Sequence, residues 1–215
     1  AGGVPALLQL AQDLPADLDA AVLIVLHVGA HPSLLPELLH SRSPWNAVHA
    51  RNGEMPVAGT MYVAPPDHHL LLEPRHLRLT RGPKENHARP AIDPLFRSAA
   101  LNWGRRVIGV VLTGQLDDGA AGLQAIKECG GITVVQNPDT AAQPAMPRAA
   151  QAAAQPHACV DIEGMGATLA ELARREQPAA PAHKPPRRLW HEVRINEGVN
   201  VMSHLQEIGS PAGLT

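Results

Sequence analysis

The sequence has few aromatic residues, and it carries no large excess of charge of either sign. Phe, Tyr and Trp together make up 2% of its 215 residues, so alanine and leucine must fill the core. The formal net charge is −2, without the excess of basic residues that nucleic-acid-binding domains usually carry. We therefore expect no nucleic-acid partner.

Long apolar runs, a signal-peptide start and closely spaced cysteines are also missing. Every apolar run is shorter than the roughly 18 residues that a membrane-spanning helix needs, and residues 1–10 lack a positively charged leader. Cys129 and Cys159 stand far apart within apolar segments, which is typical of buried free thiols. These features predict a cytoplasmic protein that does not insert into a membrane.

Apolar runs of strand length alternate with segments of helical periodicity along the chain. The predicted buried strands include 20–28, 105–114 and 132–137. The predicted helices include 4–13, 91–104, 118–131, 147–155 and 166–177. This alternation predicts an α/β fold, a doubly wound and mostly parallel sheet with helices on both faces. Residues 68–79 predict a small β-hairpin insertion, because two apolar runs flank a turn that contains proline.

The composition changes near residue 177 and divides the chain into three predicted parts. Residues 1–176 are long enough to form one catalytic domain with a substantial core. Residues 177–188 (QPAAPAHKPPRR) contain four prolines and no apolar periodicity, which predicts an extended linker. Residues 189–215 are too few for a core of their own, so we expect a C-terminal tail.

Side chains with catalytic chemistry stand at the ends of two predicted strands. His27 ends the strand at 20–28, while Asp117 and Asp118 follow the strand at 105–114, within LTGQLDDGAAG. Open α/β sheets bind their ligands outside the carboxyl ends of the strands. An imidazole is a general base at neutral pH, and a carboxylate on its far nitrogen would fix its tautomer. The residues alone leave the nucleophile open, because no serine of the chain has a nucleophile-elbow setting.

Two neighbouring histidines, His68 and His69, suggest a metal site at first sight. Adjacent side chains of a strand point to opposite faces, so the two rings cannot easily bind one ion. We therefore predict no metal site.

Seven short segments carry a resemblance to a known family. In chain order they read AGGVPALL, LIVLHV, YVAPPDHHLLL, ARPAIDPLFRSAA, LTGQLDDGAAGLQAIKECGG, VVQNP and AMPRAA. Over about residues 1–173 they resemble the catalytic domain of the chemotaxis protein-glutamate methylesterases. The resemblance implies hydrolysis of γ-glutamyl methyl esters on chemoreceptor signalling helices, often with deamidation of receptor glutamines, and no metal or organic cofactor.

The resemblance also implies a Ser-His-Asp triad. His27 takes the role of general base and Asp118 the role of the acid that orients it, while Asp117 matches a variable neighbour. The nucleophilic serine is expected immediately before Ala1. Residues 1–215 are therefore expected to fold without activity when that serine is missing.

Further site residues follow from the same resemblance. The backbone N–H groups of Ala1 and Gln115 are expected to form an oxyanion hole. Arg89, Met146 and Arg148 are expected to shape the receptor-facing cleft. The phosphoacceptor receiver domain of the family is not visible in this sequence, so we also expect a separate receiver or a methyltransferase as partner.

Two other functions stay open at this point. The Gly2-Gly3 turn before a predicted helix is typical of phosphate- or nucleotide-binding α/β domains, although the full G-x-G-x-x-G pattern is missing. The second alternative is a catalytically silent module that binds receptor helices, which a residue without a nucleophilic side chain before Ala1 would favour.

Overall fold

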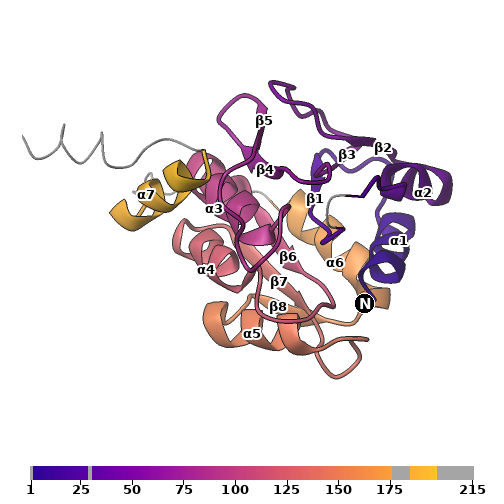
Figure 1. The fold of residues 1–215 in the computed structure, drawn as a ribbon. Helices are drawn as coiled ribbons and strands as arrows, with labels where there is room; N and C mark the ends of the chain where they lie inside the picture. Colours follow the sequence, from indigo (N-terminus) through magenta and orange to yellow (C-terminus); the bar gives the residue numbers. More distant parts are fainter. Residues whose placement is uncertain (1, 29–30, 176–184, 198–215) are drawn as a thin grey trace, which may run out of the picture.

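Helices and strands alternate along most of the chain (Figure 1). The structure is a computed structural model that describes residues 2–28, 31–175 and 185–197. In chain order the elements are α1 (Gly3–Asp13), β1 (Val22–Ile24), α2 (Leu35–Arg42), β2 (Asn46–His49), β3 (Thr60–Val63), β4 (His69–Leu72), β5 (Leu77–Thr80), α3 (Ile92–Trp103), η1 (Gly104–Arg106), β6 (Ile108–Val111), α4 (Ala120–Glu128), β7 (Ile132–Gln136), α5 (Ala145–Ala154), β8 (Ala158–Val160), α6 (Ile162–Arg174) and α7 (Arg187–Asn196).

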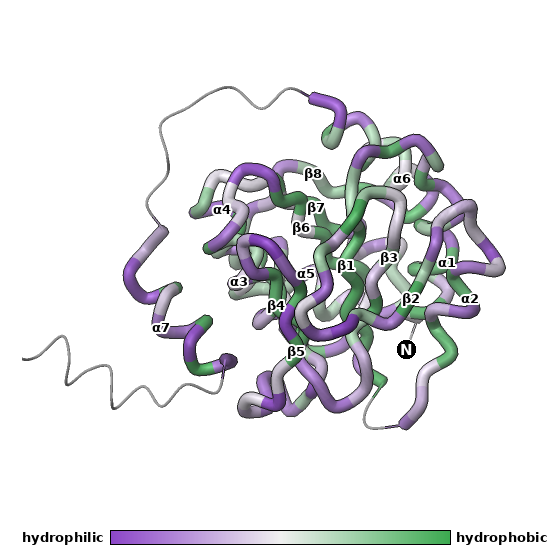
Figure 2. Tube along the Cα trace, turned by 90° about the horizontal axis from the view of Figure 1, so that it is seen from above, coloured by the Kyte–Doolittle hydropathy of each residue, from purple (hydrophilic) through white to green (hydrophobic). Residues whose placement is uncertain are grey.

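The strands form two parallel groups and one hairpin. Within the described ranges, hydrogen bonds join β1, β3 and β2 in one parallel group and β6, β7 and β8 in another. Figure 2 shows β1 between β3 and β6, so the two groups lie side by side. The antiparallel pair of β4 and β5 is the predicted hairpin insertion. The prediction of an α/β fold with mostly parallel strands is confirmed.

Helices cover both faces of the parallel strands, as predicted. On one face, α1, α2 and α6 pack against strands of both groups, with Ile24, Met61 and Val134 in a single apolar cluster. On the other face, α3 and the hairpin cover the first group, and α4 and α5 cover the second. Burial of these strands on both faces explains their continuous apolar runs.

Strand β1 is shorter than its apolar run predicted. It pairs with β3 only from Val22 to Ile24, and the last hydrogen bond at this end runs from the Ala64 N–H to the Ile24 carbonyl. Pro65 and Pro66 follow and have no N–H group to extend the ladder. His27 therefore lies in the loop after β1 rather than in the strand.

The C-terminal helix α7 begins inside the segment predicted to be an extended linker. Its buried residues Leu189 and Val193 pack against α3 and α4, in a cluster with Ala100 and Ile126. The amphipathic face of α7 thus covers a core that already exists and needs no core of its own. The remainder of the linker and tail, 177–184 and 198–215, lies outside the described residues, and the three-part division stays a prediction.

The two cysteines differ in exposure. Both are free thiols, but only Cys129 is buried, so the prediction of a buried Cys159 was wrong. Cys159 lies on β8, an edge strand that pairs only with β7 among the strands that the structure describes.

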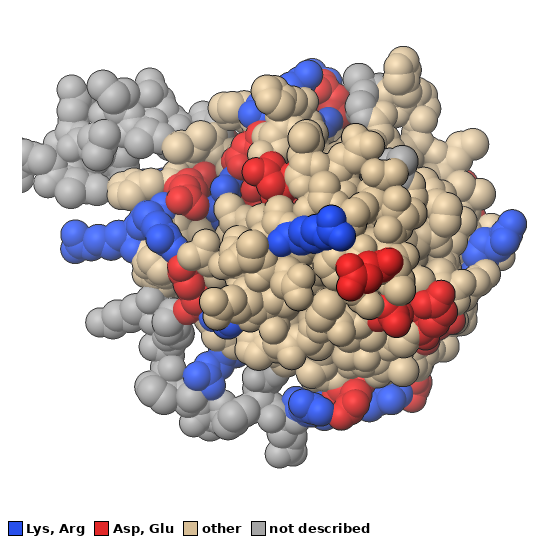
Figure 3. All heavy atoms as spheres, turned by 90° about the horizontal axis from the view of Figure 1, so that it is seen from below, with Lys and Arg blue, Asp and Glu red and all other residues tan. Residues whose placement is uncertain are grey.

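The surface seen in Figure 3 carries interspersed acidic and basic side chains, with wide areas that carry neither. This distribution agrees with the small net charge of −2. In the part of the chain that the structure describes, no helix combines the length and apolarity needed to cross a membrane.

Candidate active site

His27 and Asp118 meet although 91 positions separate them in the sequence. His27 follows β1, and Asp118 lies between β6 and α4, so both stand beyond the carboxyl ends of parallel strands. The His27 Nε2 lies 2.6 Å from the Asp118 Oδ2. The His27 side chain is 37% exposed and that of Asp118 only 1%, so the imidazole is partly accessible to solvent while its acidic partner is buried.

The Asp118 carboxylate accepts hydrogen bonds at both oxygens. Besides His27, the N–H groups of Ile92 and Asp93 donate to it at 2.7 and 3.1 Å, and the Asn86 Nδ2 donates at 2.9 Å. The two N–H groups belong to the start of α3, whose N-cap residue is Ala91 and offers no capping side chain. Asp118 therefore caps α3 from another part of the chain and gains from the helix dipole.

These hydrogen bonds also set the charge of the pair. Burial alone would raise the pKa of Asp118, but the hydrogen bonds from His27, the α3 backbone and Asn86 outweigh it and hold the pKa below its usual value. An ionised carboxylate only accepts, so the His27 Nε2 carries the proton and donates. The Nδ1 of His27 is then the ring nitrogen with a lone pair.

Asp93 is a second buried carboxylate at this site, and no pattern in the sequence pointed to a function for it. Its Oδ1 accepts from the Gly122 N–H at 2.7 Å, and its Oδ2 accepts from the Asn86 Nδ2 at 3.2 Å. Burial raises the pKa of Asp93 to about 6, with the neighbouring Asp118 charge adding to the rise against the Gly122 hydrogen bond. In sequence Asp93 resembles an ordinary acid in the first turn of a helix.

The start of α1 lies between the loops that carry His27 and Asp118. Gly2 is the N-cap of α1 with φ +84°, and a Cβ there would lie 2.9 Å from the Ala142 Cβ and 3.2 Å from the Thr113 Oγ1. A Cβ at Gly3 would lie 2.8 Å from the Leu26 side chain, next to His27. At Gly2, only glycine allows the close approach together with the left-handed backbone. Ala1, expected in the oxyanion hole, lies outside the described residues.

Gln115, the other expected oxyanion residue, is exposed on a loop held from behind. The Gly114 N–H donates to the Gln143 carbonyl, and the Met146 N–H donates to the Gly114 carbonyl, both at 3.0 Å. Leu116 follows with φ 65° and is 64% exposed. A bulky residue in this left-handed conformation is strained, which is common beside functional sites.

The three expected cleft residues have different surroundings. Met146 is 6% exposed and lies behind Gly114, where a Cβ would overlap its Sδ, so it supports the Gln115 loop. The Arg148 side chain is 63% exposed. Arg89 donates to the Asp67 carboxylate at 2.7 and 3.0 Å and to the Gly82 carbonyl at 2.8 Å, so its guanidinium holds loops together.

The histidine pair that suggested a metal at first sight is also engaged with the protein. The His69 Nε2 bonds the Pro83 carbonyl, and the Ala91 N–H donates to its Nδ1. His68 bonds the Pro66 carbonyl through its Nδ1. Across residues 2–28, 31–175 and 185–197, no group of three His, Cys, Asp or Glu side chains is arranged to hold a metal ion.

Comparisons with known proteins agree on one family. A family model described as CheB methylesterase matches residues 1–169. The protein-glutamate methylesterase/protein-glutamine glutaminase 2 of Caulobacter vibrioides is 36% identical over 179 residues, covering 80% of this chain and 52% of the relative. Its namesake from Burkholderia pseudomallei is 37% identical over 179 residues, covering 82% of this chain and 52% of the relative.

A solved structure is similar as well. The Thermotoga maritima CheB methylesterase catalytic domain superposes with a TM-score of 0.76 at 28% identity, covering 80% of this chain and 93% of that one. The chain spans about half the length of the curated relatives named above. Since the family model covers most of the chain and the fold agrees, the chain belongs to the CheB methylesterase family.

Proposed function

We propose that residues 1–176 form the catalytic domain of a protein-glutamate methylesterase, which hydrolyses γ-glutamyl methyl esters on chemoreceptors through a Ser-His-Asp triad. The observation that carries the proposal is the 2.6 Å hydrogen bond between a half-exposed His27 and a buried Asp118, in a member of this family. Asp118 orients the ring, and His27 accepts the proton of the nucleophile at its Nδ1.

The nucleophile in this proposal is a serine immediately before Ala1. The support is the packing of Gly2 on Thr113 and of Gly3 on Leu26, the residue before His27, which fixes the start of α1 against these two residues. A side chain one position before Ala1 would stand at a helix N-terminus, whose unpaired N–H groups favour developing negative charge. The N–H groups of Ala1 and Gln115 are the proposed oxyanion donors.

The reaction is an acyl transfer to water. The serine oxygen attacks the ester carbonyl while His27 takes its proton, and His27 then returns that proton to methanol as it leaves. Water, activated by His27 in the same way, attacks the acyl-serine and releases the glutamate carboxylate. An amide at the same carbon would follow the same steps and release ammonia, so glutamine deamidation belongs to the proposal.

We propose that the receptor-facing surface surrounds His27 and Asp118. Exposed Arg148 is its candidate for contact with receptor helices, whereas Met146 and Arg89 shape the loops beneath it. The relatives are about twice as long as the matched region, so a receiver or a methyltransferase as regulatory partner stays part of the proposal.

Methanol release from methylated receptor by the full-length protein tests this function. We expect His27→Ala and Asp118→Asn each to lower kcat by about 10⁴-fold, because triad losses act at this level. The neighbouring exposed Asp117 provides a matched control, and Asp117→Asn should retain most of the turnover.

Three outcomes would contradict the proposal. Unchanged turnover in His27→Ala would show that His27 is not the general base. A larger loss in Asp117→Asn than in Asp118→Asn would show that Asp117 is the acid of the triad. A residue without a nucleophilic side chain before Ala1, found by sequencing upstream codons, would favour a silent receptor-binding module.

A further inference from the structure

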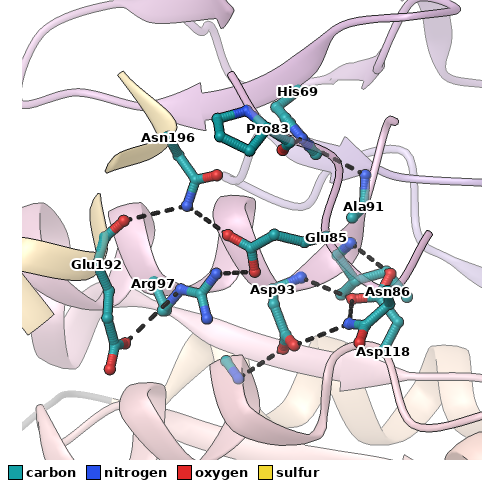
Figure 4. Close-up of polar contacts among 12 residues, drawn as sticks. His69, Pro83, Glu85, Asn86, Ala91, Asp93, Arg97, Asp118, Glu192 and Asn196 are labelled. Atoms are coloured by element: carbon teal, nitrogen blue, oxygen red, sulfur yellow. Dashed lines mark hydrogen bonds and ion pairs between the residues drawn. The ribbon is translucent and has the colours of Figure 1, made fainter. Parts of the chain in front are cut away.

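Asn86 occupies the space between the two buried carboxylates. Its Nδ2 donates to the Asp118 Oδ1 at 2.9 Å and to the Asp93 Oδ2 at 3.2 Å (Figure 4). One amide group thus donates to both acids, and among the described side chains it is the one that joins the two carboxylates. Two carboxylates that share a site without such a donor repel each other and shift their orientation or protonation.

The backbone around Asn86 is a tight turn. Glu85 and Ala88 exchange both backbone hydrogen bonds, at 2.8 and 3.2 Å, and the two residues between them have φ of 48° and 60°. This is the pattern of a type I′ turn, in which asparagine and glycine are favoured. A purely structural role for Asn86 would therefore need only its backbone conformation.

The turn itself is anchored from several sides, as Figure 4 shows. The ring of His69 bonds the Pro83 carbonyl at 2.9 Å and accepts from the Ala91 N–H at 3.3 Å, so it ties both ends of the loop. The Glu85 carboxylate accepts from the Asn196 Nδ2 at 2.6 Å and from the Arg97 guanidinium. Asn86 therefore projects from a fixed loop rather than from a free one.

We propose that Asn86 is a positioning residue for the hydrolysis, which holds the Asp118 carboxylate in the orientation that binds His27. The inference rests on the proposed function, because the orientation matters for turnover only if His27 is the base. Asn86 acts through Asp118 and touches neither the substrate nor the reacting atoms in this scheme.

A pair of glycine substitutions separates the side chain from the turn. Asn86→Gly removes the amide while keeping a residue that adopts positive φ, and His87→Gly makes the same backbone change at the adjacent exposed position. In the full-length protein we expect Asn86→Gly to lower kcat by about ten- to a hundred-fold with little change in KM, because a hydrogen bond to a charged group has about this strength. His87→Gly should retain wild-type turnover.

An isosteric variant and a spectroscopic signal complete the test. Asn86→Asp replaces the donor by a third carboxylate and should lose more turnover than Asn86→Gly. The downfield NMR resonance of the His27 Nε2 proton, assigned by its loss in His27→Ala, should shift upfield or broaden in Asn86→Gly and stay in place in His87→Gly.

The outcomes distinguish this inference from the proposed function. Equal turnover and an unmoved resonance in Asn86→Gly would overturn the positioning role, as would equal losses in both glycine variants. If the wild-type protein released no methanol, the proposed function would fail, and the resonance alone would still decide whether Asn86 orients the pair.

Discussion

Asp93 shows how the environment of one side chain sets its protonation. The residue is 5% exposed, and burial raises its pKa to about 6 from a usual value near 3.8. The folded protein therefore binds a proton at Asp93 more tightly than the unfolded chain does. Because of this difference, the contribution of Asp93 to stability increases as the pH falls from about 7 towards 4.

We predict that the wild type gains stability relative to Asp93→Asn when the pH is lowered from 8 to 5. The gain should amount to about 1.4 kcal/mol, since pH 5 lies about one unit below the raised pKa and each pKa unit corresponds to about 1.4 kcal/mol. Urea unfolding at several pH values measures it. The stability difference between the wild type and Asp93→Ala should have the same pH dependence, with a different absolute value. A stability difference that does not change with pH would contradict the raised pKa.

Asp118 titrates with the opposite sign. Its pKa is lowered in the folded state, because the hydrogen bonds that it accepts outweigh its burial. Its contribution to stability is present above the unfolded pKa and is lost as the pH falls below about 4. The two neighbouring carboxylates thus have opposite effects, in separate pH windows.

Helix α7 packs beside a buried cysteine, so its docking can be measured through the reactivity of that thiol. Leu189 and Val193 are each 2% exposed and cover Cys129, which is also 2% exposed. Burial raises the pKa of Cys129 to about 11, so its reactive thiolate form is scarce while α7 is docked.

We predict that the double substitution Leu189→Ala and Val193→Ala releases α7 and exposes Cys129. In a Cys159→Ser background, the rate of thiol labelling should increase about tenfold or more, because both access and thiolate fraction rise. Trp190→Ala is the matched control, since Trp190 is 50% exposed and its loss should leave the labelling rate unchanged. Slow labelling in the double variant would show that other residues keep Cys129 covered.

Two distant parts of the chain pack closely where α6 meets the end of α1. A Cβ at Gly166 would lie 2.6 Å from the Asp13 Cβ and 2.7 Å from the Asp13 carbonyl oxygen, so one helix must move. This contact joins the start of the chain to its last helix before the predicted linker, on the face common to both strand groups.

We predict that Gly166→Ala destabilises the protein by about 1 to 3 kcal/mol, the usual cost of overpacking, while turnover per folded molecule is retained. Gly114→Ala, in contrast, should lower turnover per folded molecule, because the new methyl group meets Met146 and displaces the Gln115 loop at the site. Thermal unfolding and methanol release measured on both variants test this contrast. Equal effects on turnover would mean that the two regions are mechanically coupled.

Many elements of this fold could be predicted from local sequence patterns. The apolar strand runs and the hairpin at 68–79 depend on neighbouring residues, and each run contains a strand of the fold, although β1 is shorter than its run. His27 and the pair Asp117 and Asp118 were candidates because they follow predicted strands, and open α/β sheets bind ligands beyond the carboxyl ends of their strands. The family resemblance, not the strand position, favoured Asp118 over Asp117.

Other features depend on residues far apart in the chain, and local sequence patterns do not predict them. Asn86 and Asp93 look like a turn residue and a helix-start acid until the fold places them against Asp118. The end of β1 depends on prolines about 40 positions later, and α7 depends on the apolar surface left by α3 and α4.

Periodicity, turn chemistry and glycine placement thus dictate which segments become strands and helices, because these preferences act within a few residues. Only the folded chain brings together an exposed imidazole, two buried carboxylates and the amide of Asn86. Hydrogen bonds and the loss of solvent around the two carboxylates, rather than residue type alone, lower the pKa of Asp118, raise that of Asp93 and decide which nitrogen of His27 carries the proton.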